Sequence, residues 1–195
     1  IDALKAKKKS MPLIRALWDR GESSPTYVNL RGNPGSPGPL VGPALPQVFS
    51  EESFQPAKVI GKNKTGNRLA LARWITQPDH PLTARVWVNR VWKHHFGRGI
   101  VTSLDNFGKL GSAPTHPELL DWLAIELVEN KWSTKYLHRL ICTSTAYRQS
   151  SLNTKTATTK DPDNVWLSRM RMRRLDAEEL HDGLLAISGR LNARL

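Results

Sequence analysis

The chain has 195 residues, which is enough for one substantial domain with appended segments, and its 39% of hydrophobic residues can build one core. Lys and Arg number 29 against 17 Asp and Glu, and the resulting net charge of +12 favours association with anionic polymers or surfaces without choosing among them. Because Cys142 is the single cysteine, the chain contains no intrachain disulfide, no CxxCH haem-attachment motif and no CxxC metal knuckle.

The two ends of the sequence and its apolar runs indicate whether the chain is part of a longer protein and whether it has a transmembrane segment. The sequence begins at Ile1 without methionine and stops at Leu195 just after a helical pattern, so we expect a piece of a longer protein. No apolar run approaches the ~18 to 20 residues that cross a bilayer, so we expect no transmembrane segment here.

The first third of the chain is irregular. Pro and Gly dominate the stretch from Gly32 to Pro46, and this composition opposes both a helix and a continuous strand ladder. We predict an extended connector there, with residues 1–64 as an irregular N-terminal segment that wraps the following domain. A short strand is expected around Tyr27 and Val28, where apolar and polar residues alternate imperfectly.

Residues 65–195 carry repeated helical patterns, and we predict a mainly α, bundle-like helical domain for this range. The richest pattern lies between Leu82 and Val101, where Gly97 and Gly99 end the predicted helix. The polar stretch of residues 150–163 is expected to be a loop. Other helices are expected to start at Thr65, at Ser133 and at two capping boxes, Thr115 with Glu118 and Asp176 with Glu179.

Polar side chains of the central helix are the first candidates for a binding site. Arg85, Asn89 and Arg90 could bind an anion. We favour the alternative that they pair with backbone carbonyls and acids of the loop after Gly99, because buried polar groups in proteins must be paired.

Adjacent histidines on the same helix suggest a metal site. His94 and His95 diverge by about 100° around the helix, however, so they cannot readily bind one ion together. One of them with His116 and Asp105 remains geometrically possible. Because His95 falls inside the apolar arc of the helix, we favour a core histidine with hydrogen-bond partners, with His94 at the edge of that arc.

Further candidates lie later in the chain. His116 lies at a helix N-terminus, where backbone N–H groups could hold an anion unless the capping box uses them. The arginines between Arg169 and Arg174 could dock a polyanion or an acidic partner domain, or could cover apolar surface with their stems. No catalytic residue and no set of metal ligands is assigned. An enzyme hypothesis places a pocket around Asn89, Arg90, His95, His116 and Arg148.

Several blocks of sequence follow one another in a specific order. They read NRLALARWITQPDHPLTARVWVNRVWKHHFGRGIV, DNFG, THPELLDWLA, LHRLICTSTAYRQSS, DPDN and RRLDAEELHDGLLAISGRL. Together, over about residues 65–191, they resemble a PSD-type domain of unknown function that is abundant in Planctomycetes and stands C-terminal in large proteins that often carry a cytochrome-c-like domain. The resemblance implies an extracytoplasmic multidomain protein, periplasmic or at the cell surface, with haem in another domain and no cofactor in this segment.

Three functions follow as hypotheses. The first is a structural or interaction module that docks other domains of the same parent protein and an anionic polysaccharide, in a protein linked to polysaccharide processing. The second is the enzyme pocket, serving carbohydrate or redox chemistry. The third is a basic nucleic-acid-binding module, which is disfavoured because the predicted helical hairpin has no separate recognition helix.

Overall fold

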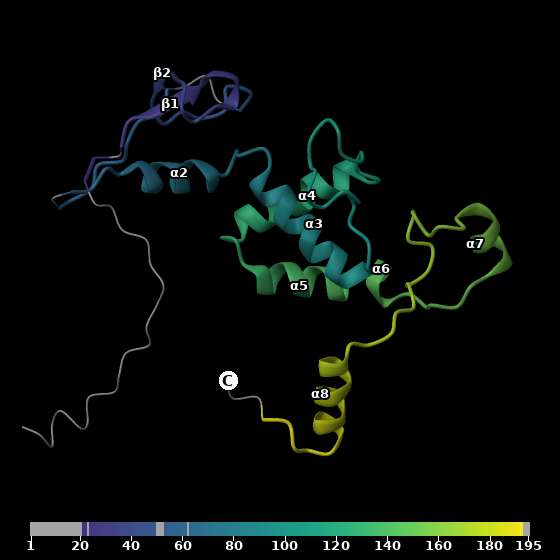
Figure 1. Ribbon diagram of the computed structural model, residues 1–195. Helices are drawn as coiled ribbons and strands as arrows, with labels where there is room; N and C mark the ends of the chain where they lie inside the picture. The colour runs from purple at the N-terminus through teal and green to yellow at the C-terminus, as the bar shows by residue number, and fades with distance from the viewer. Residues whose placement is uncertain (1–20, 23, 50–52, 62, 193–195) are drawn as a thin grey trace, which may run out of the picture. The chain divides into compact units, whose positions relative to one another are not determined.

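The computed structural model describes residues 21–22, 24–49, 53–61 and 63–192. The chain divides into two compact units, Ile1–Gln77 and Pro78–Leu195, each of which is described by itself. The described residues are mainly helical, with one small sheet, which confirms the predicted fold class (Figure 1). No helix in the described part of the chain is long and apolar enough to cross a membrane.

The first unit contains a two-stranded antiparallel sheet. Strand β1 (Thr26–Asn29) confirms the expected short strand and pairs with β2 (Pro37–Val41) after a 3-10 turn, η1 (Leu30–Gly32). The expectation that the Pro/Gly-rich stretch would form no ladder is wrong for β2. Proline is tolerated at the first residue of a strand, and Gly38 lies where a Cβ would come 2.6 Å from the carbonyl oxygen of Val28.

Helix α2 (Asn67–Ile75) follows in the same unit. Its N-cap is Gly66, with a φ of 75°, rather than the predicted Thr65, whose hydroxyl oxygen accepts a long hydrogen bond of 3.5 Å from the Asn67 N–H. Residues 1–20 lie outside the described residues. The predicted boundary at residue 64 and the wrapping of the helical domain stay predictions.

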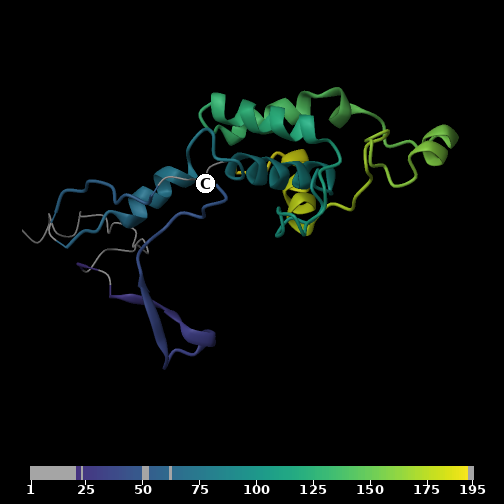
Figure 2. The same ribbon diagram turned by 90° about the horizontal axis from the view of Figure 1, so that it is seen from above.

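Three helices form the core of the second unit. Helix α3 (Thr83–Phe96) contacts both α4 (Pro117–Glu129) and α5 (Thr134–Thr143), which also contact each other (Figure 1 and Figure 2). Gly97 ends α3 in the left-handed conformation, as predicted. The buried core residues are Val88, Val91, Trp92, Phe96, Ile100, Val101, Leu120, Leu123, Leu127, Leu137 and Ile141.

The start of α4 differs from the prediction. His116, not Thr115, is the N-cap, and no side chain caps the helix. Thr115 is instead bound to Ile100: its N–H donates to the Ile100 carbonyl at 2.9 Å and its hydroxyl at 3.3 Å. The predicted Thr115–Glu118 capping box is therefore wrong, because this long-range bridge takes the side chain that the box needs.

The other predicted caps are confirmed. The Ser133 hydroxyl accepts a bond from the Tyr136 N–H at the start of α5. The Glu179 carboxylate accepts one from the Asp176 N–H at the start of the last helix, α8 (Ala177–Ile187). Between them lie α6 (Thr145–Arg148) and α7 (Lys155–Lys160), and α7 replaces part of the predicted loop because Thr154 caps it.

Candidate functional site

Asn89 is a structural residue of the core. Its side chain is 1% exposed and holds Val101 through two hydrogen bonds, each 2.9 Å long: the Val101 N–H donates to Oδ1, and Nδ2 donates to the Val101 carbonyl. A Cβ at Gly99 would come 2.9 Å from Oδ1 of Asn89. The interpretation that polar groups of α3 pair with the loop after Gly99 is thus confirmed for Asn89. It is wrong for Arg85, which donates instead to the Asp121 carboxylate of α4 at 2.5 Å and to the Pro81 carbonyl at 2.6 Å.

Arg90, the next residue of α3, is exposed to solvent. Its guanidinium group lies 3.9 Å from the carboxylate of Asp105, which is 98% exposed, so this ion pair is weak. The pairing of Arg90 with an acid of the loop was also expected from the sequence. Arg90 further lines an apolar hollow with Trp87 and Trp132.

His95 has hydrogen-bond partners, as predicted, but it is only half-buried. Its Nε2 lies 2.7 Å from Nδ1 of His138, and its Nδ1 lies 3.8 Å from Sγ of Cys142. The ring of Tyr147 meets the His95 ring edge-on at 5.4 Å. Burial, followed by the charges of His138 and His94, holds the pKa of His95 below its ordinary value, which favours the neutral imidazole.

This cluster presents a thiol, a neutral imidazole and a second imidazole in a row. The two ring nitrogens of His95 face different partners, so the three side chains do not converge on one point. Among the residues that the structure describes, no group of three or more His, Cys, Asp or Glu is placed to hold a metal ion.

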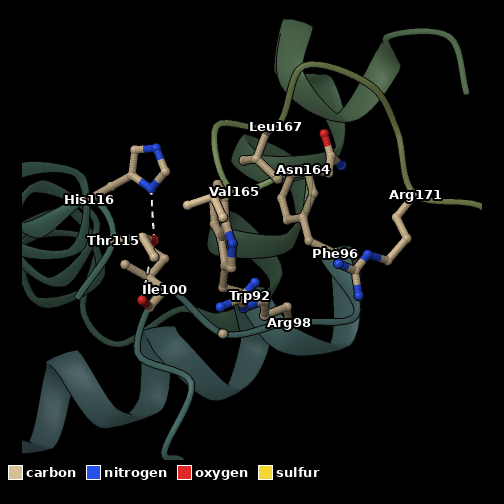
Figure 3. A pocket seen from close by; sticks show the side chains of 11 residues that line it. Trp92, Phe96, Arg98, Ile100, Thr115, His116, Asn164, Val165, Leu167 and Arg171 are labelled. Carbon is tan, nitrogen blue, oxygen red and sulfur yellow. Dashed lines mark hydrogen bonds between the residues drawn. The ribbon is translucent and has the colours of Figure 1, made fainter. Parts of the chain in front are cut away.

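His116 lines a small cavity of about 20 Å³, which has room for one water-sized group. In the view of Figure 3, His116 and Arg171 lie on opposite sides of Trp92, and Arg98 lies below. Nδ1 of His116 is 2.9 Å from the Thr115 hydroxyl, and its ring meets the Trp166 ring edge-on at 5.2 Å. The hydrogen bond and the aromatic contact therefore hold the His116 ring from two sides.

A wider, open hollow of about 470 Å³ adjoins this cavity, because Arg98, Asn164 and Arg171 line both. We call the cavity and the hollow together the basic groove. Neither Arg98 nor Arg171 forms an ion pair with any residue that the structure describes. The other residues of the hollow are Ser151, Asn153, Pro162, Asp163, Arg169, Met170 and Met172.

A tight loop after α7 builds one wall of the basic groove. The Asp161 carboxylate accepts backbone hydrogen bonds from Val165 at 2.7 Å and Trp166 at 3.0 Å. Burial by itself raises the pKa of Asp161, but hydrogen bonds from Val165, Trp166 and Ser168 outweigh it and lower the pKa below its ordinary value. The carboxylate therefore stays ionised and holds the loop closed.

Asn164 and Arg169 complete this loop. Asn164 has a φ of 52°, and its Nδ2 donates to the Arg169 carbonyl at 2.9 Å. The Arg169 guanidinium donates to the carbonyls of Asp161 at 3.1 Å and Pro162 at 2.9 Å, so its role is structural. The predicted arginine run thus divides: Arg169 supports the loop, and Arg171 faces the groove.

Comparisons with known proteins place the chain in a family. A protein family of unknown function, PSD1 (DUF1553), matches residues 67–195. The chain belongs to this family. The predicted PSD-type resemblance is confirmed, whereas the planctomycete origin and the link to cytochrome c domains stay expectations. Comparison with curated proteins and with solved structures gave no match.

The five residues of the sequence-based pocket lie in different surroundings in this PSD1 domain. His116 lines the basic groove, Arg90 lines the apolar hollow, Asn89 is buried in the core and His95 contacts His138. Arg148 is exposed at the end of α6. The structure therefore does not bring them around one pocket.

Sequence reasoning missed Arg98, Asp161 and Asn164 as groove residues. The signal for the last two is the DPDN motif, in which a capping-type Asp and an Asn that tolerates positive φ flank Pro162 and Asp163. For Arg98 the sequence offers a weaker signal: a basic residue between two glycines, directly after the buried end of a helix.

Proposed function

We propose that this PSD1 domain is a noncatalytic binding module of an extracytoplasmic, multidomain, haem-containing protein, and that its basic groove binds acidic groups of a polysaccharide. The resemblance to the planctomycete domain supports the location and the haem in another domain of the parent protein. The observation that carries the binding role is that Arg98 and Arg171 line both hollows of the groove and form no ion pair with any described residue, although Arg171 donates a long hydrogen bond of 3.5 Å to the Asp163 carbonyl.

The chemistry of the groove suits carboxylate or sulfate groups. Guanidinium groups bind planar carboxylates through two parallel hydrogen bonds. The lining carries Arg98, Arg169 and Arg171 against the single acid Asp163. The cavity of about 20 Å³ beside His116 holds one small polar group, while the wider hollow is open enough to receive the rest of a sugar residue.

A polysaccharide fits this groove better than a nucleic acid does. Nucleic-acid sites without sequence preference follow the phosphate backbone along a continuous basic channel and stack bases on aromatic side chains. Here the basic groove is a cavity for one water-sized group beside a single hollow of about 470 Å³, which has the size of a small-molecule site rather than of a long channel. Helices α4 and α5 bury residues such as Leu127 and Leu137 in the core, and neither stands apart as a recognition helix.

Helix α8 supports the second part of the proposal, docking to other domains of the parent protein. Its residues Leu180, Leu184 and Ile187 recur at helical spacing and are 48%, 68% and 87% exposed. An apolar stripe of this kind is typical of an interaction surface. Leu184→Glu should therefore weaken association with the parent protein's other domains, measured by pull-down with those domains.

The enzyme hypothesis has one observation in its favour. His95 lies next to the Cys142 thiol and to His138, and a nucleophile, a base and a residue that orients the base form the arrangement of covalent catalysis. This hypothesis predicts that His95→Ala changes the turnover of a carbohydrate or redox substrate by the full-length protein. Unchanged turnover together with unchanged metal content would remove it.

The groove is tested by binding of the full-length protein to polygalacturonate, a polymer of acidic sugars. The double variant Arg98→Gln/Arg171→Gln loses charge-assisted hydrogen bonds worth about 1.5–3 kcal/mol each, so affinity should fall at least ~tenfold. The matched control, Arg139→Gln/Arg190→Gln, removes the same charge from exposed sites outside the groove and should change affinity less than ~twofold.

Two results would contradict the proposal. Equal losses in both double variants would mean that net charge alone drives binding. Tighter binding to DNA than to polygalacturonate, with a steep dependence on salt, would instead support the nucleic-acid hypothesis.

A further inference from the structure

A second hollow of about 560 Å³ opens on the N-terminal half of α3, and it shares no residue with the basic groove. Its volume lies within the range of about 300–1,000 Å³ that is usual for small-molecule sites. Most of its lining is apolar, and the residues are Leu82, Thr83, Val86, Trp87, Arg90, Trp132 and Thr134. We call it the aromatic hollow.

Trp87 is exposed although the helical pattern places it in the apolar arc of α3. The core helices cover Val88, Val91 and Trp92, whereas Trp87 lies at the edge of the arc and is 47% exposed. Arg90 follows three residues later, so the two side chains are neighbours on the helix surface. A large aromatic side chain and a cation therefore stand side by side in one hollow.

Trp132 reaches the same hollow from the turn between α4 and α5. Lys131 and Trp132 have φ values of 55° and 59°, an uncommon left-handed pair for residues other than glycine. Backbone bonds from Lys131 to Val128 at 3.0 Å and from Trp132 to Leu127 at 2.8 Å fix this turn. Such conformations persist only where the surrounding structure determines them, so the backbone at Trp132 is fixed, and its partly buried side chain packs against the core.

We propose that the aromatic hollow binds a single acidic sugar residue, with the apolar C–H face of the ring packed against Trp87 and the carboxylate on Arg90. The proposal rests on the polysaccharide-binding function above and adds a site for the sugar ring itself. Thr134 also lines the hollow and can partner a sugar hydroxyl, whereas the Thr83 hydroxyl is already bound to Nδ1 of His80 at 2.9 Å.

The charge of Arg90 decides between this ligand and an apolar side chain of a partner protein. The only acid paired with Arg90 among the described residues is the fully solvated Asp105, at 3.9 Å. An apolar side chain seated in the hollow would remove water from the guanidinium group without providing a counter-charge, which is costly. A sugar carboxylate supplies that charge while its ring covers the indole.

The test compares Trp87→Ala with Trp122→Ala in the full-length protein. The two tryptophans are 47% and 46% exposed, and Trp122 lies on α4 outside the hollow. Binding of oligogalacturonate is measured by calorimetry, with a neutral glucan oligosaccharide of equal length as the comparison ligand. Trp87→Ala should weaken oligogalacturonate binding ~tenfold, and Trp122→Ala should leave it within ~twofold.

A second variant reports on the charge. Arg90→Gln should reduce the preference for the acidic over the neutral oligosaccharide. Denaturation midpoints close to that of the unsubstituted protein show that Trp87→Ala and Arg90→Gln both fold. Equal affinities of the Trp87→Ala and Trp122→Ala proteins would overturn the inference. So would a Trp87→Ala protein that binds sugar normally but associates less with the parent's other domains, because the hollow would then hold a protein anchor.

The outcomes separate this inference from the proposed function. If the groove variant Arg98→Gln/Arg171→Gln loses affinity and Trp87→Ala does not, the groove stands and the inference falls. If only Trp87→Ala and Arg90→Gln lose affinity, the hollow is the sugar site and the groove proposal falls. If none of these variants changes affinity, both are wrong.

Discussion

Replacement of Asn89 by Ala should be among the most destabilising changes in the second unit. The substitution removes two hydrogen bonds of 2.9 Å from one residue, Val101, which is itself only 3% exposed. Each buried backbone group left without a partner costs about 1–3 kcal/mol. Because the two groups belong to one residue and their costs are not independent, we expect a total loss of about 3 kcal/mol.

Urea denaturation followed by tryptophan fluorescence measures this loss. With a slope of about 1–3 kcal/mol per molar urea, the midpoint should fall by ~1–3 M while the slope stays unchanged. Hydrogen exchange should show that the Val101 amide, which is protected in the unsubstituted protein, becomes exchangeable in Asn89→Ala. The control is Arg90→Ala at the next, exposed position, which should cost no more than about 0.5 kcal/mol.

A loss of less than about 1 kcal/mol with a protected Val101 amide would refute this reasoning. Such a result would mean that the Asn89 side chain does not satisfy the backbone after Gly99. Asn89→Asp provides a further check, because it keeps the Oδ1 acceptor but replaces the donor to the Val101 carbonyl by a second oxygen and buries a charge. It should therefore be at least as damaging as Asn89→Ala.

Three more outcomes follow from the same geometry. Gly99→Ala should destabilise the protein by about 1–3 kcal/mol, because its Cβ would come 2.5 Å from the Val101 carbonyl oxygen. Gly183→Ala lies in α8, where the added Cβ meets open space, and it should stabilise the protein by about 0.5–1 kcal/mol in the same urea assay. Because the pKa of His95 is lowered, the unfolded chain binds more protons, so stability should fall as the pH drops from 6.5 toward the lowered pKa; His95→Gln should flatten the urea midpoint across that interval. The lowered pKa of Asp161 stabilises the fold above the ordinary value of 3.8, and this contribution should be lost as the pH falls through the lowered pKa; Asp161→Asn should remove that acid-side transition and speed exchange of the Trp166 amide.

The helices were predictable where the signals are local. The stop of α3 at Gly97 and the cap of α5 at Ser133 depend on residues within one turn of the helix end, and both are confirmed. The start of α4 failed for the opposite reason. Thr115 has the right spacing for a cap, but its hydrogen bonds go to Ile100, which lies far back in the chain and on which no local pattern reports.

The candidate site shows the same limit. Asn89 was predictable, because a polar side chain on the buried face of a helix must find partners, and the loop after Gly99 is the nearest source. The groove was not, because Arg98 and Arg171 come from distant parts of the sequence and meet only through the loop that Asp161 closes. Spacing along one helix cannot reveal a pairing of that kind.

Helix α3 links the fold to its candidate sites through the width of its apolar arc. The periodicity of the sequence predicts how wide the apolar arc of α3 is, but not how much of the arc other helices cover. In the structure, α4 and α5 cover the middle of the arc at Val88, Val91 and Trp92. Trp87 lies beyond that cover, and Arg90 stands next to it on the polar side. The excess of apolar surface over covering helices therefore explains why Trp87 is exposed at the aromatic hollow, where we propose that a sugar ring packs.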